Sequence, residues 1–439
     1  MRHLKIFLFL LLAFGASGLR GQSAREELSA DPACADGIYR VYTPENTVRT
    51  PAPKGYKPFY ISHFGRHGTR WLLRNNEYTD LKAYFDAAAE AGGLTDFGQD
   101  VRRRIELIYA DGIDRAGDLA PLGATQHREI AGRMYADYPA VFADDARIDA
   151  RSTVVVRCVL SMAAFCERLK ELNPRLQITR TAGIRNTRIF NFFNTQANPG
   201  VSAEYLALPK SKAWRQAGEE FRASRIDPSR LFGHLFTPEY APRVEQPQRL
   251  LQMLNNTRAS LHGLDLDVTL DDLFTPGELY ALWECENRDY YLFRGPNPAT
   301  GRYPEYLAKI LLEDLLDRAD RAIASGTPAA DLRFGHDANL MTLLNLMRFE
   351  GCSTTAASPD GIAEVWRNYR ISPMAANIQL IFYRRKGSDE VLVKMLHNER
   401  EVRIPLPSDS APYYRWSELE KFYRDILDGV PAPPAVSNR

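Results

Sequence analysis

The sequence has little of what marks a metal-binding or nucleic-acid-binding protein. Among 439 residues there are only five cysteines and eight histidines, without CxxC pairs or a Cys/His cluster spaced as in structural zinc sites. The formal net charge is only +1, which gives no reason to expect a nucleic-acid partner. Beyond the N-terminus there is no apolar run long enough to span a membrane, no internal repeat and no low-complexity segment. These absences leave a globular chain of one large or two modest domains.

The most apolar segment lies at the N-terminus. Arg2 and Lys5 precede the apolar residues 6–16, and small residues follow. This run is shorter than the roughly 20 residues that a bilayer requires, and its flanks are those of a secretory signal peptide. We therefore predict that residues 1–22 are a signal peptide and that the mature chain is exported, to a periplasm or out of the cell.

The few cysteines allow at most two disulfides in an oxidising compartment. Cys158 and Cys166 fall in one predicted helix, residues 153–172, and would lie roughly 12 Å apart, too far for a disulfide. They are expected to be small buried hydrophobic residues. Cys285 could geometrically pair with Cys352. The connectivity stays open among Cys34, Cys158, Cys166, Cys285 and Cys352.

The most informative motif is Arg66-His67-Gly68-Thr69-Arg70, which directly follows a strand-like run at residues 58–64. An imidazole is a good nucleophile toward phosphorus, and guanidinium groups match phosphate oxygens in bidentate geometry. Gly65 and Gly68 allow the backbone to turn sharply and to approach a bound anion. The motif therefore indicates phosphate chemistry.

Two later segments supply complementary groups. Residues 333–340 contain His336-Asp337 after a short strand-like run and before a helical pattern. Residues 151–161 contain Arg157 near the start of the predicted helix. The chain thus offers a second histidine, an acid and a third arginine, in three motifs that each lie where a strand gives way to a helix.

With these motifs the chain resembles the histidine phosphatase superfamily, in branch 2, which comprises acid phosphatases, phytases and multiple inositol-polyphosphate phosphatases. The resemblance implies that His67 attacks phosphorus and becomes phosphohistidine, and that Asp337 donates the proton to the leaving group. It implies that the phosphate is bound by Arg66, Arg70, Arg157 and His336. Because arginines supply the positive charge, the mechanism requires no cofactor and no metal.

Two departures leave the subgroup open. A proline often follows the first motif in this family, but Trp71 and Leu72 stand here, as in the multiple inositol-polyphosphate phosphatases. That group usually carries His-Ala-Glu, however, where this chain has His336-Asp337-Ala338, as in acid phosphatases and bacterial phytases.

Strands that alternate with helices predict an α/β fold, a three-layer sandwich with a mainly parallel central sheet and an inserted α-helical cap domain. The signal peptide is followed by a first core part (23–187), the cap (188–330) and a second core part (331–439). Strands are expected at 58–64, 146–151, 177–182 and 331–335, with a hairpin of 378–383 and 390–396. The cap is expected to contain helices at 205–221, 246–261, 276–285 and 306–323.

The leading functional hypothesis is an exported phosphomonoesterase that acts on phytate or other inositol phosphates. An acid phosphatase of broad or sugar-phosphate specificity is the second hypothesis, and a non-catalytic phosphate-binding relative is the third. The expected partner is a small phosphate monoester, without nucleic acid, membrane span or obligate protein partner. A substrate with several phosphates needs further cations, and the candidates are Arg74, Lys210, Lys212 and Arg215.

The other histidines carry no motif. We interpret His63 as a structural histidine and His127 as a surface or packing residue, and assign no role to His234, His262 and His397.

Overall fold

The computed structural model describes residues 22–44, 49–201 and 203–431. The predicted signal peptide, except Gln22, lies outside these ranges. Within them, no helix is long and apolar enough to cross a membrane. The strands are β1 (Tyr56–Arg66), β2 (Arg147–Ser152), β3 (Gln177–Ala182), β4 (Ala330–Gly335), β5 (Asn377–Arg385), β6 (Val391–His397), β7 (Arg400–Glu401) and β8 (Tyr413–Arg415).

These strands form a single mixed sheet in the order β3-β2-β4-β1-β5-β6-β7, with β8 also paired to β6. Pairing is parallel from β3 through β2 and β4 to β1. It is antiparallel from β1 onward, where β5 and β6 form the predicted hairpin. The sheet of the described strands is therefore mixed and not mainly parallel as expected, because its second half is built from hairpin-type pairings. All six predicted strands are confirmed within a few residues, and the three motifs follow β1, β2 and β4 in the parallel half.

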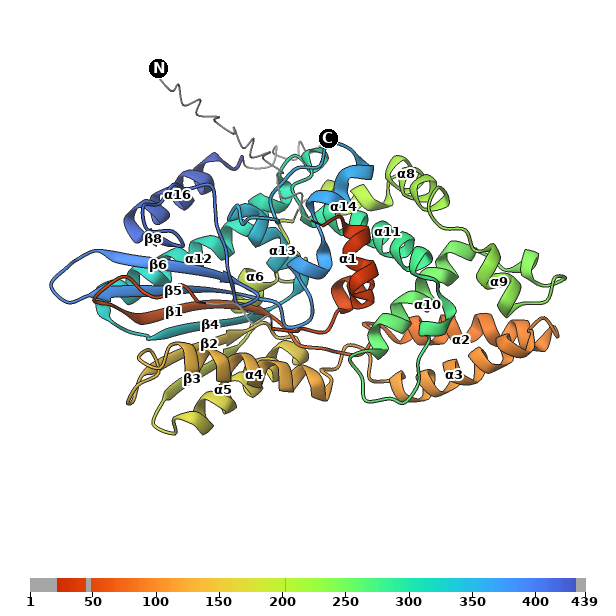
Figure 1. The fold of residues 1–439 in the computed structure, drawn as a ribbon, viewed down its shortest axis with the longest axis horizontal. Coiled ribbons are helices and arrows are strands. Elements are labelled where there is room, and N and C mark those ends of the chain that lie inside the picture. Colours follow the sequence, from red (N-terminus) through yellow and green to blue (C-terminus); the bar gives the residue numbers. More distant parts are fainter. Residues whose placement is uncertain (1–21, 45–48, 202, 432–439) are drawn as a thin grey trace, which may run out of the picture.

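Helices cover both faces of the sheet, which confirms the α/β sandwich (Figure 1). Along β1, Tyr60 and Phe64 join one hydrophobic cluster and Ile61 joins the other, as the two-residue period of a strand requires. The face with Ile61 packs on α4 (Pro121–Asp137) and α5 (Val156–Leu172). The opposite face packs on α12 (Tyr303–Ser325), α13 (Asp337–Leu346) and α16 (Trp416–Gly429).

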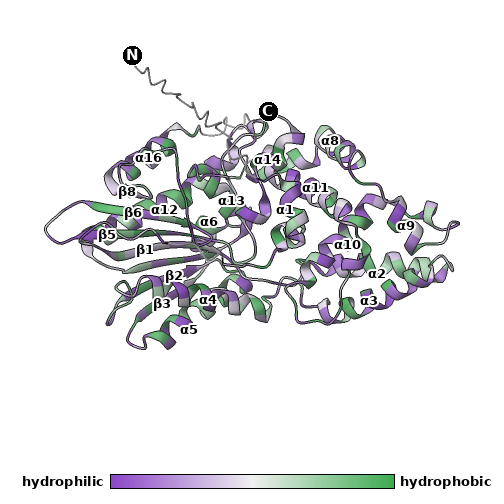
Figure 2. Ribbon diagram, in the orientation of Figure 1, coloured by the Kyte–Doolittle hydropathy of each residue, from purple (hydrophilic) through white to green (hydrophobic). Residues whose placement is uncertain are grey.

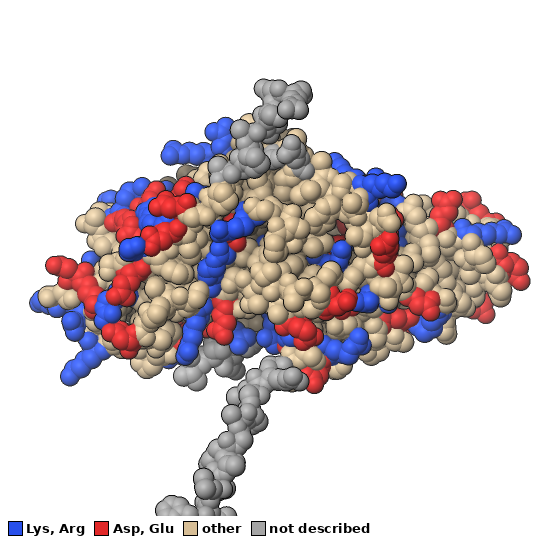
Figure 3. All heavy atoms as spheres, turned by 90° about the horizontal axis from the view of Figure 1, so that it is seen from above, with Lys and Arg blue, Asp and Glu red and all other residues tan. Residues whose placement is uncertain are grey.

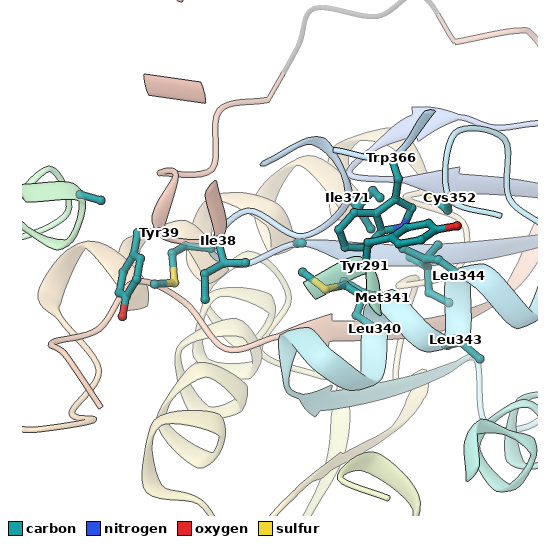
Figure 4. Packing of buried hydrophobic residues seen from close by; sticks show 14 of the residues in the cluster. Ile38, Tyr39, Tyr291, Leu340, Met341, Leu343, Leu344, Cys352, Trp366 and Ile371 are labelled. Atoms are coloured by element: carbon teal, nitrogen blue, oxygen red, sulfur yellow. The ribbon is translucent and has the colours of Figure 1, made fainter. Parts of the chain in front are cut away.

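The flanking helices are amphipathic, with purple and green residues mixed along each in Figure 2. Around α13 the core contains Leu340 and Leu344 on the helix and Trp366 and Tyr291 beside it (Figure 4). Each of these residues is 3% exposed or less, so the helix that carries Asp337 at its first turn is anchored by close packing.

Ion pairs fasten α12 to the sheet. Its Asp314 lies 2.7 Å from Arg151 of β2 and 2.7 Å from Arg333 of β4. Its Arg318 lies 2.6 Å from both Asp149 and Asp331. The helix therefore belongs spatially to the sheet, although it falls inside the 188–330 segment that was expected to form the cap.

A helical region lies beside the sheet, at the right of Figure 1. It contains α2 (Asn75–Glu90) and α3 (Asp96–Gly112) together with α8 (Lys212–Ala223), α9 (Ser229–Leu235), α10 (Pro247–Leu261) and α11 (Pro276–Arg294). The division at 188 and 330 stays a prediction. The remaining helices are α1 (Ala24–Ala30), α6 (Ile184–Phe190), α7 (Ala203–Ala207), α14 (Ile362–Val365) and α15 (Asn368–Ile371).

One helix that the sequence predicted was wrong. The single helix expected at 205–221 is divided into α7, a 3-10 turn at Leu208–Lys210 and α8, because Pro209 cannot continue a helix and Ser211 caps the next one. The pairing considered for Cys285 and Cys352 does not form, since all five cysteines are free and buried. Cys158 and Cys166 are small buried residues of α5, as predicted.

Candidate phosphate-binding site

The three motifs meet at the carboxyl end of the parallel strands. Arg66 ends β1 opposite Gly335, which ends the neighbouring β4. His67 and His336 directly follow these two residues, and Arg157 lies in the first turn of α5, after β2. Ligands in α/β sheets bind at this edge because loops and helix N-termini converge there. The fold thus assembles residues that are far apart in the sequence.

His67 lies at the centre of the assembly and is only 2% exposed. Its Nδ1 is 2.9 Å from the carbonyl oxygen of Gly68. A carbonyl only accepts, so Nδ1 carries the proton and Nε2 keeps a free lone pair. The backbone N–H donates to Gly335 (3.0 Å), and the backbone carbonyl accepts from Ala375 (3.0 Å). These bonds fix the ring's tautomer and its place in the loop.

The loop after His67 is held by helices α4 and α5. The Gly68 N–H donates to Ser161 Oγ (3.1 Å), and the Thr69 N–H donates to Gln126 Oε1 (2.9 Å). A Cβ on Gly68 would lie 2.3 Å from the carbonyl oxygen of Gly123. Glycine is therefore required at this position for close approach of the two backbones.

Two arginines flank His67 and are anchored by backbone carbonyls. Arg66 Nη1 donates to Ile38 and to Ser372, each at 2.7 Å. Arg70 Nη1 donates to Trp71 (2.8 Å), and its guanidinium lies 5.2 Å from the centre of the Tyr39 ring. These contacts fix the planes of both groups and leave other nitrogens unused.

Those unused nitrogens are buried donors without a hydrogen-bond partner among the described residues. They are Arg66 Nε, Arg70 Nε and Arg157 Nε, together with Arg66 Nη2, which makes no hydrogen bond although it lies 3.3 Å from a carboxylate oxygen of Asp337. Buried guanidinium donors without a partner are costly, and an anion at this position would supply their acceptors. The three predicted arginines therefore form a cationic site whose chemistry suits a phosphate group.

The second histidine and the acid complete the site. The His336 ring centre lies 5.7 Å from that of His67, and its Nε2 lies 3.4 Å from Thr153 Oγ1. Asp337 begins α13, where its Oδ1 accepts from the Ala338 N–H at 2.7 Å. Its Oδ2 lies 3.3 Å from Arg66 Nη2.

Burial and the arginines set the charges of these groups. Burial, followed by Arg157 and Arg66, holds the pKa of His67 well below its ordinary value. Burial and Arg157 lower the pKa of His336 to about 3. Burial by itself raises the pKa of Asp337, but Arg66 and Arg70 outweigh it and lower the pKa to about 2. Both imidazoles are thus neutral, and the positive charge belongs to the arginines.

Several neighbours of the site had no signal in the sequence. Ile38 and Tyr39 come from the 3-10 segment η1 (Pro32–Tyr39), far from any motif. Tyr290 and Glu286 come from α11. Burial, then Asp337, raises the pKa of Tyr290 well above its ordinary value. Burial, then Asp289 and Asp36, raises the pKa of Glu286 to about 8. Only long-range packing places these side chains near the motifs.

The structure places the other candidate cations in the helical region. Arg74 is exposed at the N-cap of α2, where its backbone N–H donates to Glu77 (2.9 Å). Lys210 and Lys212 are exposed near the start of α8. Arg215 lines a hollow of about 230 Å³ together with Arg222 and Arg288. A role for any of these in substrate binding stays a prediction.

The histidines outside the motifs are mostly structural. His63 and His127 are buried, with ring centres 5.5 and 5.6 Å from Phe334. Their ring nitrogens have no hydrogen-bond partner in the described ranges. His127 is therefore a packing residue. His262 differs from them, since it makes two ion pairs.

On the face seen in Figure 3, Lys and Arg side chains lie among Asp and Glu. In the described part of the chain, no group of three or more His, Cys, Asp or Glu could hold a metal ion.

No family model matches the chain. It is 25% identical, over 97% of its length and 94% of the relative's, to multiple inositol polyphosphate phosphatase 1 of Gallus gallus. A multiple inositol polyphosphate phosphatase of Bifidobacterium longum, solved with inositol hexasulfate, matches with a TM-score of 0.75 and 20% identity, covering 89% of this chain and 97% of that one. The phytase from D. castellii matches with a TM-score of 0.62 and 15% identity, covering 93% and 90%. These similarities agree with the resemblance stated from the motifs, and the two structural matches show that the chain has the fold of these phosphatases.

Proposed function

We propose that this chain is a histidine phosphomonoesterase that acts on phytate or other inositol phosphates through a phosphohistidine intermediate. The observation that carries the proposal is the position of His67, with its Nδ1 proton fixed on the Gly68 carbonyl and three guanidinium groups around the ring. The relatives named as inositol polyphosphate phosphatases and phytases support the substrate class.

In the first step, the lone pair of His67 Nε2 attacks phosphorus, and the bond from phosphorus to the ester oxygen breaks. The arginines Arg66, Arg70 and Arg157 bind the equatorial oxygens and offset their charge. His336 adds a hydrogen bond, and the N-terminus of α13 adds a favourable dipole. Asp337 gives its proton to the departing alkoxide.

In the second step, water attacks the phosphorus of phosphohistidine. The Asp337 carboxylate accepts the proton that the water loses, and the electron pair of the P–N bond returns to His67 Nε2. Inorganic phosphate leaves, and both residues are back in the states that began the cycle.

The low pKa of Asp337 in the free protein is compatible with a role as acid. Arg66 and Arg70 lower that pKa to about 2, and they are the same cations that would bind the phosphate. A bound dianion offsets their charge, which raises the pKa of Asp337 and favours the protonated form when substrate is present.

We also propose that the enzyme needs no metal and is exported. The first point rests on the three arginines, which supply the charge that a metal would otherwise supply. A chelator is therefore expected to leave the activity unchanged, and restoration of lost activity by zinc or magnesium would contradict this point. Export rests on the N-terminal sequence, with basic residues before the apolar residues 6–16.

A phosphate-release panel tests the proposal. The purified chain is compared on phytate, glucose 1-phosphate and p-nitrophenyl phosphate, with His67→Ala as the inactive control. Preference for phytate in kcat/KM supports the inositol-phosphate function. Equal values for all three substrates favour the broad acid phosphatase, and phosphate binding without release favours the non-catalytic relative.

A further inference from the structure

The short N-terminal segment η1 contacts two arginines of the phosphate site. In η1, the carbonyl of Ile38 accepts from Arg66 at 2.7 Å, and the ring of Tyr39 lies 5.2 Å from the Arg70 guanidinium. Figure 4 shows these two residues next to each other on the N-terminal segment. Both arginines therefore depend for their orientation on where η1 lies.

A group of four charges, in which Asp36 and Arg258 are buried while His262 and Asp271 are partly exposed, links η1 to the end of α10. Asp36 of η1 is 1% exposed and lies 2.8 Å from Arg258 and 2.7 Å from His262 Nδ1. Asp271 lies 3.0 Å from Arg258 and 3.0 Å from His262 Nε2. A neutral imidazole has only one N–H, so two ring nitrogens on two carboxylates require the imidazolium. Two cations then balance two anions.

The same end of α10 directly contacts the loop that follows His67. Gly263 follows His262, and a Cβ added to it would lie 2.2 Å from Cγ2 of Thr69. Thr69 is the residue between Gly68 and Arg70 in the first motif. The end of α10 thus reaches the motif twice, once through η1 and once through this contact.

We propose that His262 is a positioning residue of the phosphate site, which clamps Asp36 and Asp271 and so holds η1 and the end of α10 against Arg66, Arg70 and the loop of His67. The inference rests on the proposed function, because it concerns the same site. It assigns a role to a histidine that belongs to none of the three motifs.

This clamp, the two ion pairs of His262 with Asp36 and Asp271, is expected to depend on pH. Hydrogen bonds to Asp271 and Asp36 raise the pKa of His262 to about 9, against the opposing effect of burial. A raised histidine pKa means that the stabilisation is complete below about pH 6.5 and is lost as the pH rises through about 9. Above that range two carboxylates face the single charge of Arg258, while the nearby Asp272 is paired with Arg104.

One other group near the site titrates in the same range. Burial, then Asp289 and Asp36, raises the pKa of Glu286 to about 8. Its ionisation would also disfavour a bound anion. The experiment therefore includes Glu286→Gln, which removes this titration and leaves the clamp intact.

The test measures the affinity for inorganic phosphate by calorimetry, at about pH 6.5 and about pH 10. This readout does not require turnover, so it separates failure of the clamp from failure of the proposed enzymatic function. His262→Gln is expected to bind phosphate at least about tenfold more weakly at the lower pH, because misplaced guanidinium groups bind the anion less well. The exposed His234→Gln is the control and is expected to bind as the wild type does.

Rescue by a permanent cation decides between positioning and general instability. His262→Arg keeps its charge at every accessible pH, so it is expected to restore binding at about pH 6.5 and to lose less affinity than the wild type at about pH 10. Unaltered binding in His262→Gln would overturn the proposal. If His262→Gln does not fold, His262→Arg still tests the proposal. A loss of phosphate affinity at alkaline pH as large in His262→Arg as in the wild type would overturn the proposal. Alkaline loss abolished only by Glu286→Gln would overturn it as well.

Discussion

Arg66 Nη2 lies 3.3 Å from Asp337 Oδ2, so the arginine that precedes the proposed nucleophile is paired with the proposed acid. The Arg66 side chain is fully buried, and that of Asp337 is 19% exposed. The pair couples phosphate binding to proton donation, because a bound dianion competes with the carboxylate for the same cation. In the free protein the Asp337 carboxylate is the counter-ion of Arg66, a place that the phosphate of the substrate would take.

Asp337→Asn is expected to impair esters with poor leaving groups most. An activated aryl phosphate needs little protonation of its leaving group, so its transfer to His67 should be much faster than transfer from an inositol phosphate. Single-turnover rates with p-nitrophenyl phosphate and phytate measure this difference. Equal losses for both substrates would argue that Asp337 is not the acid.

Arg157→Ala is expected to weaken inhibition by inorganic phosphate by about 10- to 100-fold, the usual effect of losing hydrogen bonds from a charged donor. Its Nε has no partner among the described residues and its charge acts on both His67 and His336. Arg147→Ala, at the exposed start of β2, is the matched control. An inhibition constant unchanged in Arg157→Ala would place Arg157 outside the site.

Arg74→Ala tests substrate choice. If this exposed arginine contacts an outer phosphate, the KM for phytate should rise and lose much of its salt dependence, while the KM for a small aryl phosphate barely changes. Arg103→Ala on α3, which is also exposed, is the control. Parallel effects on both substrates would exclude Arg74 as a specificity residue and favour broad specificity.

His127→Leu is expected to reduce the sensitivity of the fold to acid. Burial lowers the pKa of His127 to about 4, so below about pH 6.5 the unfolded chain binds a proton that the folded chain does not. Between about pH 7.5 and pH 4, the wild type should lose about 2–3 kcal/mol more of its free energy of unfolding than the variant. Denaturant unfolding at both pH values measures this, and identical losses would contradict it.

The sequence predicted the parts of the fold that local patterns encode. Short apolar runs followed by glycine and a polar motif marked β1 and β4 correctly, because a strand that ends at a binding loop has both features. The clustering of His67, Arg157 and His336 also followed, since parallel strands bring their carboxyl ends to one edge.

Long-range packing could not be predicted in the same way. Nothing local in Asp36 or His262 indicates that they meet across more than 200 residues of sequence. The role of η1 was missed because Ile38 contributes a backbone carbonyl, which every residue has. The place of α12 on the sheet depends on ion pairs of Asp314 with Arg151 and Arg333, whose partners a single sequence does not reveal.

The most direct test of the account is identification of the phosphorylated residue. The chain is mixed with substrate, quenched in alkaline denaturant during turnover, digested and analysed by mass spectrometry. The account predicts an alkali-stable, acid-labile phosphoryl group on the peptide that contains His67, absent from His67→Ala together with the activity. Phosphate on a different residue, or substantial turnover in His67→Ala, would contradict the assignment of His67 as the nucleophile.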